Sequence, residues 1–224
     1  MSERGPRLVL LGKQGAGKGT QATRLAENYG VAHLSTGDLF REAATHGHAL
    51  GIEAKQFMDR GELVPDETVV GLIEEQLAID GRAASGFVLD GFPRTRYQAE
   101  ELERILDGRD LDFAIDLDVP TEIVLHRIAG RRVCESCGAL YHVDHPPKEN
   151  WTCDVCGGEV TQRDDDTEDS VMRRLELYEI ETLPVIQFYR RAGTLARVDG
   201  SEESDEVFKH LVETVASLFD PTRP

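Results

Sequence analysis

The sequence predicts an α/β fold in which a five-stranded parallel sheet carries helices on both faces. Short apolar runs alternate along the chain with longer amphipathic segments of helical length, as in a parallel sheet covered on both sides. The glycine-rich stretch 12–21 directly follows the first apolar run and opens an amphipathic segment. A strand, a glycine loop and a helix in this order place a ligand at the carboxyl end of a parallel strand.

Capping and stop residues set the element boundaries. Ser35 to Asp38 offers N-cap side chains, Pro65 to Glu67 is typical of a first helical turn, and Gly30 and Gly61 end helices. The predicted strands are 8–11, 31–34, 87–89, 112–118 and 194–198. The predicted helices are 18–29, 39–46, 49–60, 65–79, 95–107, 120–130, 168–191 and 203–219, and Pro184 is expected to kink the seventh. Residues 130–167 break the alternation and show no strong period.

The composition excludes some classes of partner. The 224 residues include 42 acidic and 25 basic ones, giving a formal net charge of −17 that disfavours nucleic acid and anionic membranes. No apolar run approaches the roughly 18 residues of a membrane span, and the polar start of the chain lacks the apolar stretch of a signal peptide. We therefore expect a cytoplasmic protein. The acidic surface fits either a high-salt habitat or an ordinary acidic protein.

All four cysteines lie in two Cys-x-x-Cys pairs, Cys134 with Cys137 and Cys153 with Cys156. In a cytoplasmic chain this spacing indicates a metal site rather than disulfides. Four thiolates leave no open coordination position, which is typical of a structural zinc, with iron as the alternative metal. The segment is poor in apolar residues and needs such a metal to hold its fold.

The glycine loop predicts a phosphate site formed by Gly15, Ala16, Gly17, Lys18, Gly19 and Thr20. Its backbone N–H groups and the start of the helix favour anionic oxygens, and Lys18 adds a mobile cation. The alternative is a glycine-rich turn without a ligand. Because Gly19 stands between Lys18 and the hydroxyl of Thr20, we expect magnesium to be held largely by nucleotide oxygens and water.

The variant Gly-Lys-Gly-Thr-Gln at 17–21 resembles the adenylate kinases among the nucleoside monophosphate kinases. Four further stretches resemble them in the same order and spacing: 35–41, 61–67, Asp90-Gly91-Phe92-Pro93-Arg94 and 130–132. One departure is Gln14, where the family usually has proline.

The resemblance implies reversible phosphoryl transfer from MgATP to AMP, giving two ADP. The transfer would be direct and in line, with closure of a lid, a motion for which adenylate kinases are a standard example. It also implies a role in adenine nucleotide homeostasis and purine salvage, one structural Zn²⁺, Mg²⁺ with ATP, and a monomer. The implied parts are a phosphate-loop core at 1–34, 65–129 and 168–224, an AMP-binding flap at 35–64 and a zinc-binding lid at 130–167.

The resemblance also assigns site residues. ATP would be bound by Gly15, Ala16, Gly17, Lys18, Gly19, Thr20, Arg127, Arg131, Leu140, Tyr141 and Glu202. The last three would contact ATP through their backbone. AMP would be bound by Thr36, Arg41, Glu62, Leu63, Val64, Gly91, Phe92, Pro93, Arg94, Gln98, Arg163 and Arg174. The catalytic cations would be Lys18, Arg94, Arg127, Arg131, Arg163 and Arg174.

The side chains can support these roles. Arg41 and Arg94 can each grip a phosphate with two N–H groups, although either alone could be a solvated surface residue. Gln98 follows Arg94 by one helical turn and offers both a donor and an acceptor to adenine, its alternative being a surface glutamine. Asp90 could orient magnesium through water or cap the following turn.

The acidic run Asp164 to Asp166 would repel phosphate, so we expect it to point away and to bind arginines on lid closure. The histidines His126, His142 and His145 are expected to be solvent or packing residues. Two other functions stay open: a kinase for CMP or UMP, and a nucleotide-dependent binding module without turnover. Gln98 and the zinc lid argue against the first, and the retained lysine and arginines against the second.

Overall fold

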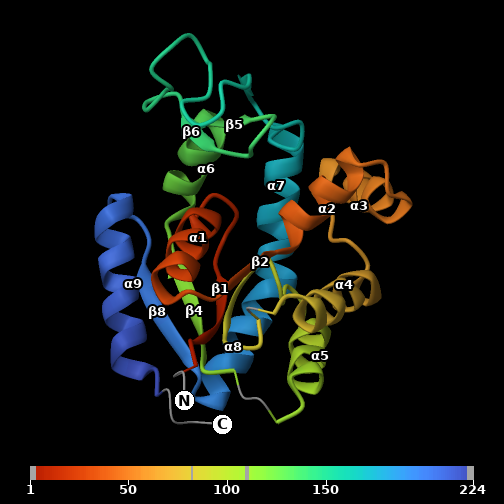
Figure 1. The fold of residues 1–224 in the computed structure, drawn as a ribbon, viewed down its shortest axis with the longest axis vertical. Coiled ribbons are helices and arrows are strands. Elements are labelled where there is room, and N and C mark those ends of the chain that lie inside the picture. The colour runs from red at the N-terminus through yellow and green to blue at the C-terminus, as the bar shows by residue number, and fades with distance from the viewer. Residues whose placement is uncertain (1–3, 82, 109–110, 221–224) are drawn as a thin grey trace.

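Five parallel strands form the central sheet of the computed structural model, which describes residues 4–81, 83–108 and 111–220 (Figure 1). The strand order is β2-β3-β1-β4-β8. The strands are β1 (Arg7–Leu11), β2 (Ala32–Ser35), β3 (Phe87–Asp90), β4 (Phe113–Asp118) and β8 (Leu195–Asp199). All five lie within one or two residues of the predicted ranges, so the parallel sheet is confirmed.

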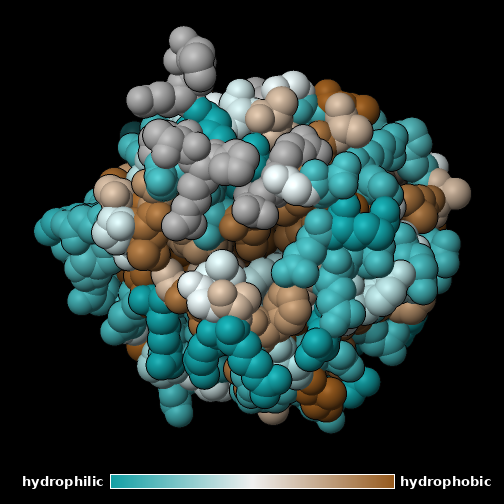
Figure 2. Space-filling model, turned by 90° about the horizontal axis from the view of Figure 1, so that it is seen from below, coloured by the Kyte–Doolittle hydropathy of each residue, from teal (hydrophilic) through white to brown (hydrophobic). Residues whose placement is uncertain are grey.

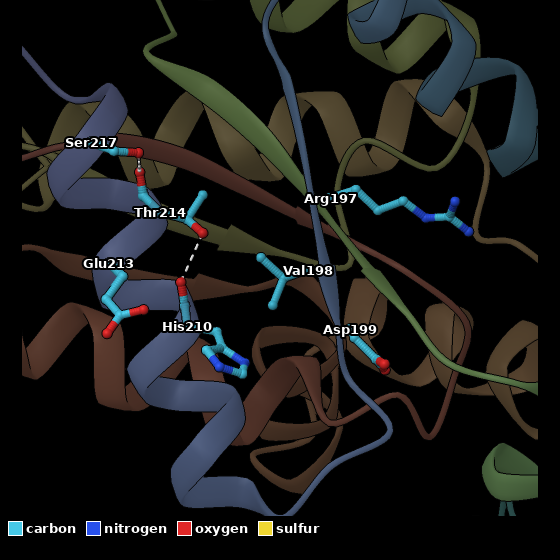
Figure 3. Close-up of a pocket in the computed structure, with 7 residues that line it drawn as sticks. All are labelled: Arg197, Val198, Asp199, His210, Glu213, Thr214 and Ser217. Carbon is cyan, nitrogen blue, oxygen red and sulfur yellow. Dashed lines mark hydrogen bonds between the residues drawn. The ribbon is translucent and has the colours of Figure 1, made fainter.

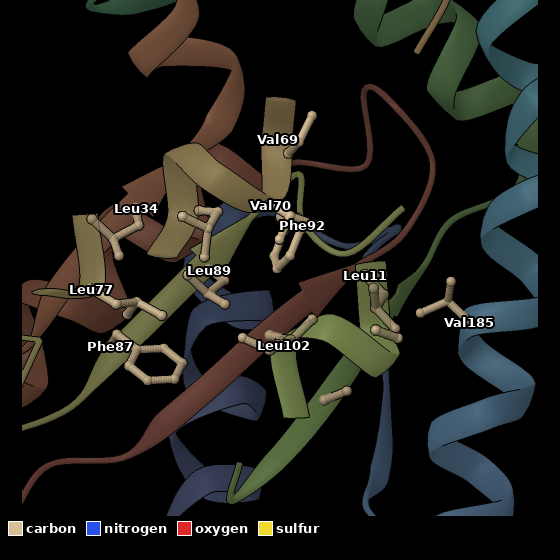
Figure 4. Close-up of a cluster of buried hydrophobic side chains, with 14 of the residues drawn as sticks. Leu11, Leu34, Val69, Val70, Leu77, Phe87, Leu89, Phe92, Leu102 and Val185 are labelled. Carbon is tan, nitrogen blue, oxygen red and sulfur yellow. The ribbon is translucent and has the colours of Figure 1, made fainter. Parts of the chain in front are cut away.

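Helices cover both faces of this sheet, as the apolar runs predicted. They are α1 (Lys18–Tyr29), α2 (Thr36–Thr45), α3 (Ala49–Asp59), α4 (Asp66–Ile79), α5 (Arg96–Leu106), α6 (Thr121–Gly130), α7 (Glu168–Leu177), α8 (Leu183–Ala192) and α9 (Ser204–Leu218). Along β1, Val9 and Leu11 point into a core with α4, α5 and α8 (Figure 4). Leu8 and Leu10 point into a second core with α1, α6 and α9.

The strand register brings the chemistry-bearing loops to one edge of the sheet. Asp90, the last residue of β3, pairs in register with Leu10 of β1 on one side and with Ser35 of β2 on the other. The glycine loop after β1, the start of α2 after β2 and the turn after β3 therefore lie side by side. Ligands of open parallel sheets bind at this edge.

The predicted helix over 168–191 is interrupted by a π-helical turn, η1 (Tyr178–Thr182). The Leu183 N–H donates to the carbonyl of Tyr178, five residues back. Pro184 lacks an N–H, and its ring crowds the carbonyl four residues before it, so the regular ladder cannot run through this point. The wider turn replaces the simple kink that the sequence predicted.

Residues 130–167 contain a second, antiparallel sheet that the sequence did not indicate. Its strands are β5 (Arg131–Cys134), β6 (Leu140–His142) and β7 (Val160–Thr161), in the order β6-β5-β7. Strands of two to four residues are too short to show a period of two, so no strand could be predicted in this segment. In Figure 1 this small sheet stands at the top of the molecule, and α2 and α3 stand at the upper right.

The surface agrees with the acidic composition. Seen from the end that carries the chain termini, hydrophilic residues make up most of the visible face, and hydrophobic ones show in separate patches (Figure 2). Among the described residues, no helix combines the length and the apolar character needed to cross a membrane.

Candidate active site and metal centre

The glycine loop joins β1 to α1 in a conformation that requires glycine. Gly12, Gly15 and Gly17 have φ angles of 139°, 80° and 97°. A side chain at Gly15 would also lie 2.7 Å from Cγ1 of Ile128 in α6, and one at Gly12 would lie 2.6 Å from the carbonyl oxygen of Leu117. The loop is therefore held between β4 and α6 with its backbone exposed to a ligand rather than to side chains.

Lys18 lies inside this loop. Its Nζ donates to the carbonyl oxygens of Gly12 and Lys13, each at 2.8 Å. Burial lowers the pKa of Lys18 to about 8; Asp90 opposes the shift, whereas Arg94 and Arg131 add to it. Lys18 is thus close enough to Arg94 and Arg131 for their charges to lower its pKa, although these arginines come from other parts of the chain.

Asp90 and the following turn lie next to the loop. A side chain at Gly19 would lie 3.4 Å from Oδ2 of Asp90, so this carboxylate faces the start of α1. After it, Nε of Arg94 donates to the carbonyl of Gly91 at 2.9 Å, and Oγ1 of Thr36 donates to the same oxygen at 3.1 Å. The turn therefore fixes Arg94 beside Thr36, and Phe92 and Pro93 are buried beneath it.

Arginines from four separate segments converge beyond this turn. Burial and the neighbouring Arg174 lower the pKa of Arg94. Burial, then Arg41 and Arg131, lower the pKa of Arg163 to about 10. Such mutual repulsion in a partly buried site is costly unless anions are present, so the cluster is suited to a polyanionic ligand.

Carboxylates from the same acidic run partly neutralise these arginines. Asp165 accepts from Arg174 at 2.7 Å and lies 4.0 Å from Arg41. Asp166 accepts two N–H groups from Arg131. We expected the run to point away and pair only on closure; instead Asp165 and Asp166 are buried among the site arginines, and the exposed Asp164 lies near Lys55. The physical reason is the cost of leaving a buried guanidinium unpaired.

The segment 61–64 approaches α7 from the end of α3. A side chain at Gly61 would collide with the backbone of Ser170, and the Glu62 N–H donates to the carbonyl of Phe57 at 2.9 Å. Val64 is buried, whereas Glu62 and Leu63 are partly exposed. In α7, Arg174 donates to the carbonyl of Met58 at 2.6 Å, which ties the same segment to the arginine cluster.

Gln98 is almost fully buried, and both ends of its carboxamide have protein partners. Its Oε1 accepts from the backbone N–H of Arg94 at 2.7 Å, and its Nε2 donates to Oδ1 of Asp66 at 2.8 Å. Thr95 donates to the other carboxylate oxygen of Asp66 at 3.0 Å. Asp66 was not predicted as a site residue, because an acidic residue in a first helical turn is sufficiently explained by its interaction with the helix dipole.

Arg127 of α6 connects the glycine loop to the turn after β8. Its guanidinium donates to the carbonyls of Ala16, Gly200, Ser201 and Glu202 at 2.8–3.3 Å. The Glu202 side chain is exposed and pairs with His210 at 3.2 Å, so only its backbone faces Arg127. In the small sheet, Leu140 is exposed and the hydroxyl of Tyr141 donates to Sγ of Cys153 at 3.4 Å.

The four cysteines form one cluster beside the small sheet: Cys134 ends β5, and the other three lie in the connections between its strands. Their sulfur atoms all lie within 4.8 Å of one another. Sγ of Cys134 is 3.5 Å from that of Cys156, and Sγ of Cys137 is 3.6 Å from that of Cys153. A disulfide requires about 2.05 Å, whereas thiolates around a tetrahedral zinc with bonds of about 2.3 Å lie roughly 3.8 Å apart. The donor set therefore fits a structural zinc.

A groove of about 410 Å³ lies elsewhere, between β8 and α9 (Figure 3). It is lined by Arg197, Val198, Asp199, His210, Glu213, Thr214 and Ser217. Two of its charged groups have partners of their own: Arg197 pairs with Asp118 at 2.6 Å, and Asp199 accepts from Ser201. None of the predicted site residues lines it.

Comparison with known proteins identifies the family. The family model described as adenylate kinase matches residues 10–194, which include the glycine loop, the arginine cluster and the four cysteines. The chain belongs to the adenylate kinase family. It is 47% identical over 214 residues to an adenylate kinase of Geobacillus sp. (strain WCH70), covering 94% of this chain and 99% of the relative. It is 50% identical over 208 residues to one of Thermodesulfovibrio yellowstonii (92% of this chain, 96% of the relative).

Membership of the adenylate kinase family confirms the predicted family, the phosphate-loop fold and the enzyme class, a phosphotransferase. It does not favour a kinase for another monophosphate or a binding module without turnover. Kinases of this type use Mg²⁺ with ATP, and the four-cysteine cluster fits the zinc lid that the sequence predicted.

Proposed function

We propose that this chain transfers a phosphoryl group reversibly from MgATP to AMP, giving two ADP. The observation that carries this proposal is the convergence of Lys18 with arginines of several segments at the carboxyl edge of the sheet. Two phosphate sites flank Asp90 there, one at the glycine loop and one at Gly91 to Arg94. Two nucleotides bound in this way would face each other across the cation cluster, as direct in-line transfer requires.

The donor site is formed by the glycine loop and α6. The backbone of Gly15, Ala16, Gly17, Gly19 and Thr20 would hold the triphosphate together with Lys18. Arg127, which already spans the loop and the 200–202 turn, would lie against the adenine with Leu140 and Tyr141, and the Glu202 carbonyl would accept a hydrogen bond.

The acceptor site lies on the other side of Asp90. Thr36, Arg41 and the Gly91–Arg94 turn would bind the AMP phosphate, and Glu62 to Val64 would line the nucleoside. Gln98 would recognise adenine through its carboxamide, which then has to share or exchange its bonds to Arg94 and Asp66. This is the step of the proposal on which the choice of acceptor depends.

The transferred group would be stabilised by Lys18, Arg94, Arg131, Arg163 and Arg174. Phosphate oxygens would replace the aspartate partners of Arg131 and Arg174. Like a carboxylate, a phosphate can accept two N–H groups from one guanidinium. Magnesium, when bound, neutralises phosphate charge, and Asp90 would orient it through water. The described residues include no Cys, Ser–His pair or His placed to form a covalent intermediate in this cluster, so we propose direct transfer.

Closure would complete the site. Arg131 and Arg163 lie in the 130–167 segment and Arg41 in the 35–64 segment, so the cluster is complete, and water excluded, only while both segments lie over the core. We propose that the cysteines hold one zinc whose role is to keep the 130–167 segment folded. We further propose that the protein is a cytoplasmic monomer that serves adenine nucleotide homeostasis.

A coupled assay of the purified protein with MgATP and one monophosphate at a time tests the proposal. We expect rapid ADP formation with AMP and much slower turnover with CMP, UMP and GMP. Faster turnover with CMP or UMP would replace the acceptor assignment. ATP binding without turnover of any monophosphate would support a binding module instead.

A further inference from the structure

The side chains of His126, His142 and Asp144 form a second group of metal-ligating atoms, separate from the four cysteines. One ring nitrogen of each histidine and a carboxylate oxygen of Asp144 all lie within 4.8 Å of one another. Nδ1 of His142 is 3.2 Å from Oδ2 of Asp144, and Nε2 of His126 is 3.6 Å from the same oxygen. The side chains of His126 and Asp144 are 69% and 56% exposed, so an ion from solvent can reach them.

We propose that these three residues bind a divalent transition metal of the zinc class at the surface of the protein. Zinc bonds to imidazole nitrogen and carboxylate oxygen are about 2.0–2.2 Å, which places tetrahedral ligand atoms roughly 3.4 Å apart. The two distances above bracket this value. Two imidazoles with one carboxylate suit zinc, nickel or copper better than magnesium or calcium, which prefer oxygen ligands.

The second ring nitrogen of His142, Nε2, has the kind of partner that is usual for a metal-bound histidine. Its Nε2 lies 3.4 Å from the carbonyl oxygen of His126, which favours the tautomer with the proton on Nε2. Metal-bound histidines commonly donate their second ring N–H to a backbone carbonyl in this way. The lone pair of Nδ1 then faces Asp144, whose backbone N–H donates to it at 3.2 Å and would give way to a cation.

The site joins two parts of the chain that meet at the end of α6. His126 lies one turn before the end of α6, whereas His142 is the last residue of β6 and Asp144 lies in the turn after it. The Val143 N–H donates to the carbonyl of Gly130 at 2.9 Å, and any side chain at Gly130 would collide with the His142 ring. A metal there would clamp the small sheet to α6, next to Arg127.

The clamp has a consequence that rests on the proposed function. If the 130–167 segment has to move for closure, an ion that ties it to α6 would slow turnover, whereas the binding of the ion itself does not depend on catalysis. The two parts can therefore be tested separately.

Calorimetric titration with Zn²⁺ tests the site, starting from protein that already holds one zinc per chain in the cysteine cluster. We expect one further zinc per chain. His126→Gln and Asp144→Asn should each weaken it at least about tenfold, since even outer-shell changes cost metal sites 10- to 100-fold. His48→Gln, an exposed histidine at the start of α3, is the matched control and should change nothing.

Melting curves provide a second readout. Added Zn²⁺ should raise the melting temperature of the parent protein and the His48→Gln control, but not that of His126→Gln. The absence of a second zinc, or a second zinc bound equally well by His126→Gln and Asp144→Asn, would overturn the site. If zinc binds at these residues and turnover stays unchanged, the clamp is wrong while the site stands.

Discussion

Replacing Gln98 tests how the acceptor turn is held, because this side chain connects α4, α5 and the turn that carries Arg94. Gln98→Ala removes the acceptor of the Arg94 N–H (2.7 Å) and the donor to Asp66 (2.8 Å) at once. The side chain is 1% exposed, so no water replaces it from outside without rearrangement. The expected loss is therefore larger than for a surface glutamine.

The magnitude follows from the two bonds and the buried stem. A neutral hydrogen bond contributes about 1 kcal/mol, and one to a charged group such as Asp66 contributes about 1.5–3 kcal/mol. Each buried methylene adds about 0.8 kcal/mol. Asp66 is partly exposed and can regain water, which lowers the total. We expect Gln98→Ala to reduce the free energy of unfolding by about 3 kcal/mol.

Urea unfolding followed by circular dichroism measures this loss, with Gln76→Ala as the control. Gln76 is a half-buried glutamine of α4, and its replacement should cost less than about 1 kcal/mol. If Gln98 also recognises adenine, the KM for AMP should rise about 10- to 100-fold and that for ATP should change little. A loss of stability no greater than that of the control would refute the structural role, and equal effects on both nucleotides would refute the recognition role.

Three further perturbations have definite expected outcomes. Lys18→Met should lower turnover at least about a thousandfold and leave the circular dichroism spectrum unchanged, because the lysine stabilises phosphate charge rather than the core; near-normal turnover would remove the glycine loop from the active site. The pKa of Lys18 is lowered to about 8, so between pH 8 and 10.5 the folded protein binds fewer protons than the unfolded chain, and the stability that this buried charge costs is regained as the pH rises. Phosphate binds the charged form, so kcat/KM for ATP should fall as the pH rises through about 8, and Lys18→Arg should flatten the profile; a profile unchanged by this variant would mean that Lys18 is not the titrating group. Removing the metal with a chelator and a thiol reagent should change the emission of Trp151, the only tryptophan, lower the melting temperature and weaken turnover, while the far-ultraviolet spectrum changes little. Well under one bound metal per chain, with the emission unmoved, would show that the cysteines do not hold the segment together.

The features that could be predicted from the sequence are those whose physics is local. A glycine loop between a strand and a helix, or a strand of unbroken apolar residues, identifies itself within a few residues, and all five strands of the main sheet were placed within one or two residues. The two Cys-x-x-Cys pairs are likewise recognised from a spacing that spans only four residues each. Closeness within each pair follows from a single turn, whereas the pairing of β5 with β7 brings the two pairs together.

The features that could not be predicted depend on partners far apart in the chain. Gln98 and Asp66 are 32 residues apart, and Arg131 and Asp166 are 35 apart. Each of these side chains has an ordinary local explanation as a surface or helix-end residue, and only the packed structure shows that it is paired. The cluster at His126 was missed for the same reason, since its members come from α6, from the end of β6 and from the turn after it.

The pairing of Asp165 and Asp166 explains how a chain of net charge −17 can carry a site for polyanions. These aspartates adjoin Arg163 in the sequence and pair in space with Arg131 and Arg174, so the acidic run neutralises cations of the site. A nucleotide phosphate offers the same guanidiniums a second set of paired oxygens, and the carboxylates of Asp165 and Asp166 released by the exchange then need water or other donors. Because Asp165 and Asp166 lie in the same segment as Arg131 and Arg163, exchanging their partners also shifts the forces that position that segment. Phosphate binding and closure of the 130–167 segment would then depend on the same ion pairs. Asp166→Asn should therefore change the affinity for phosphate and the closure of this segment together.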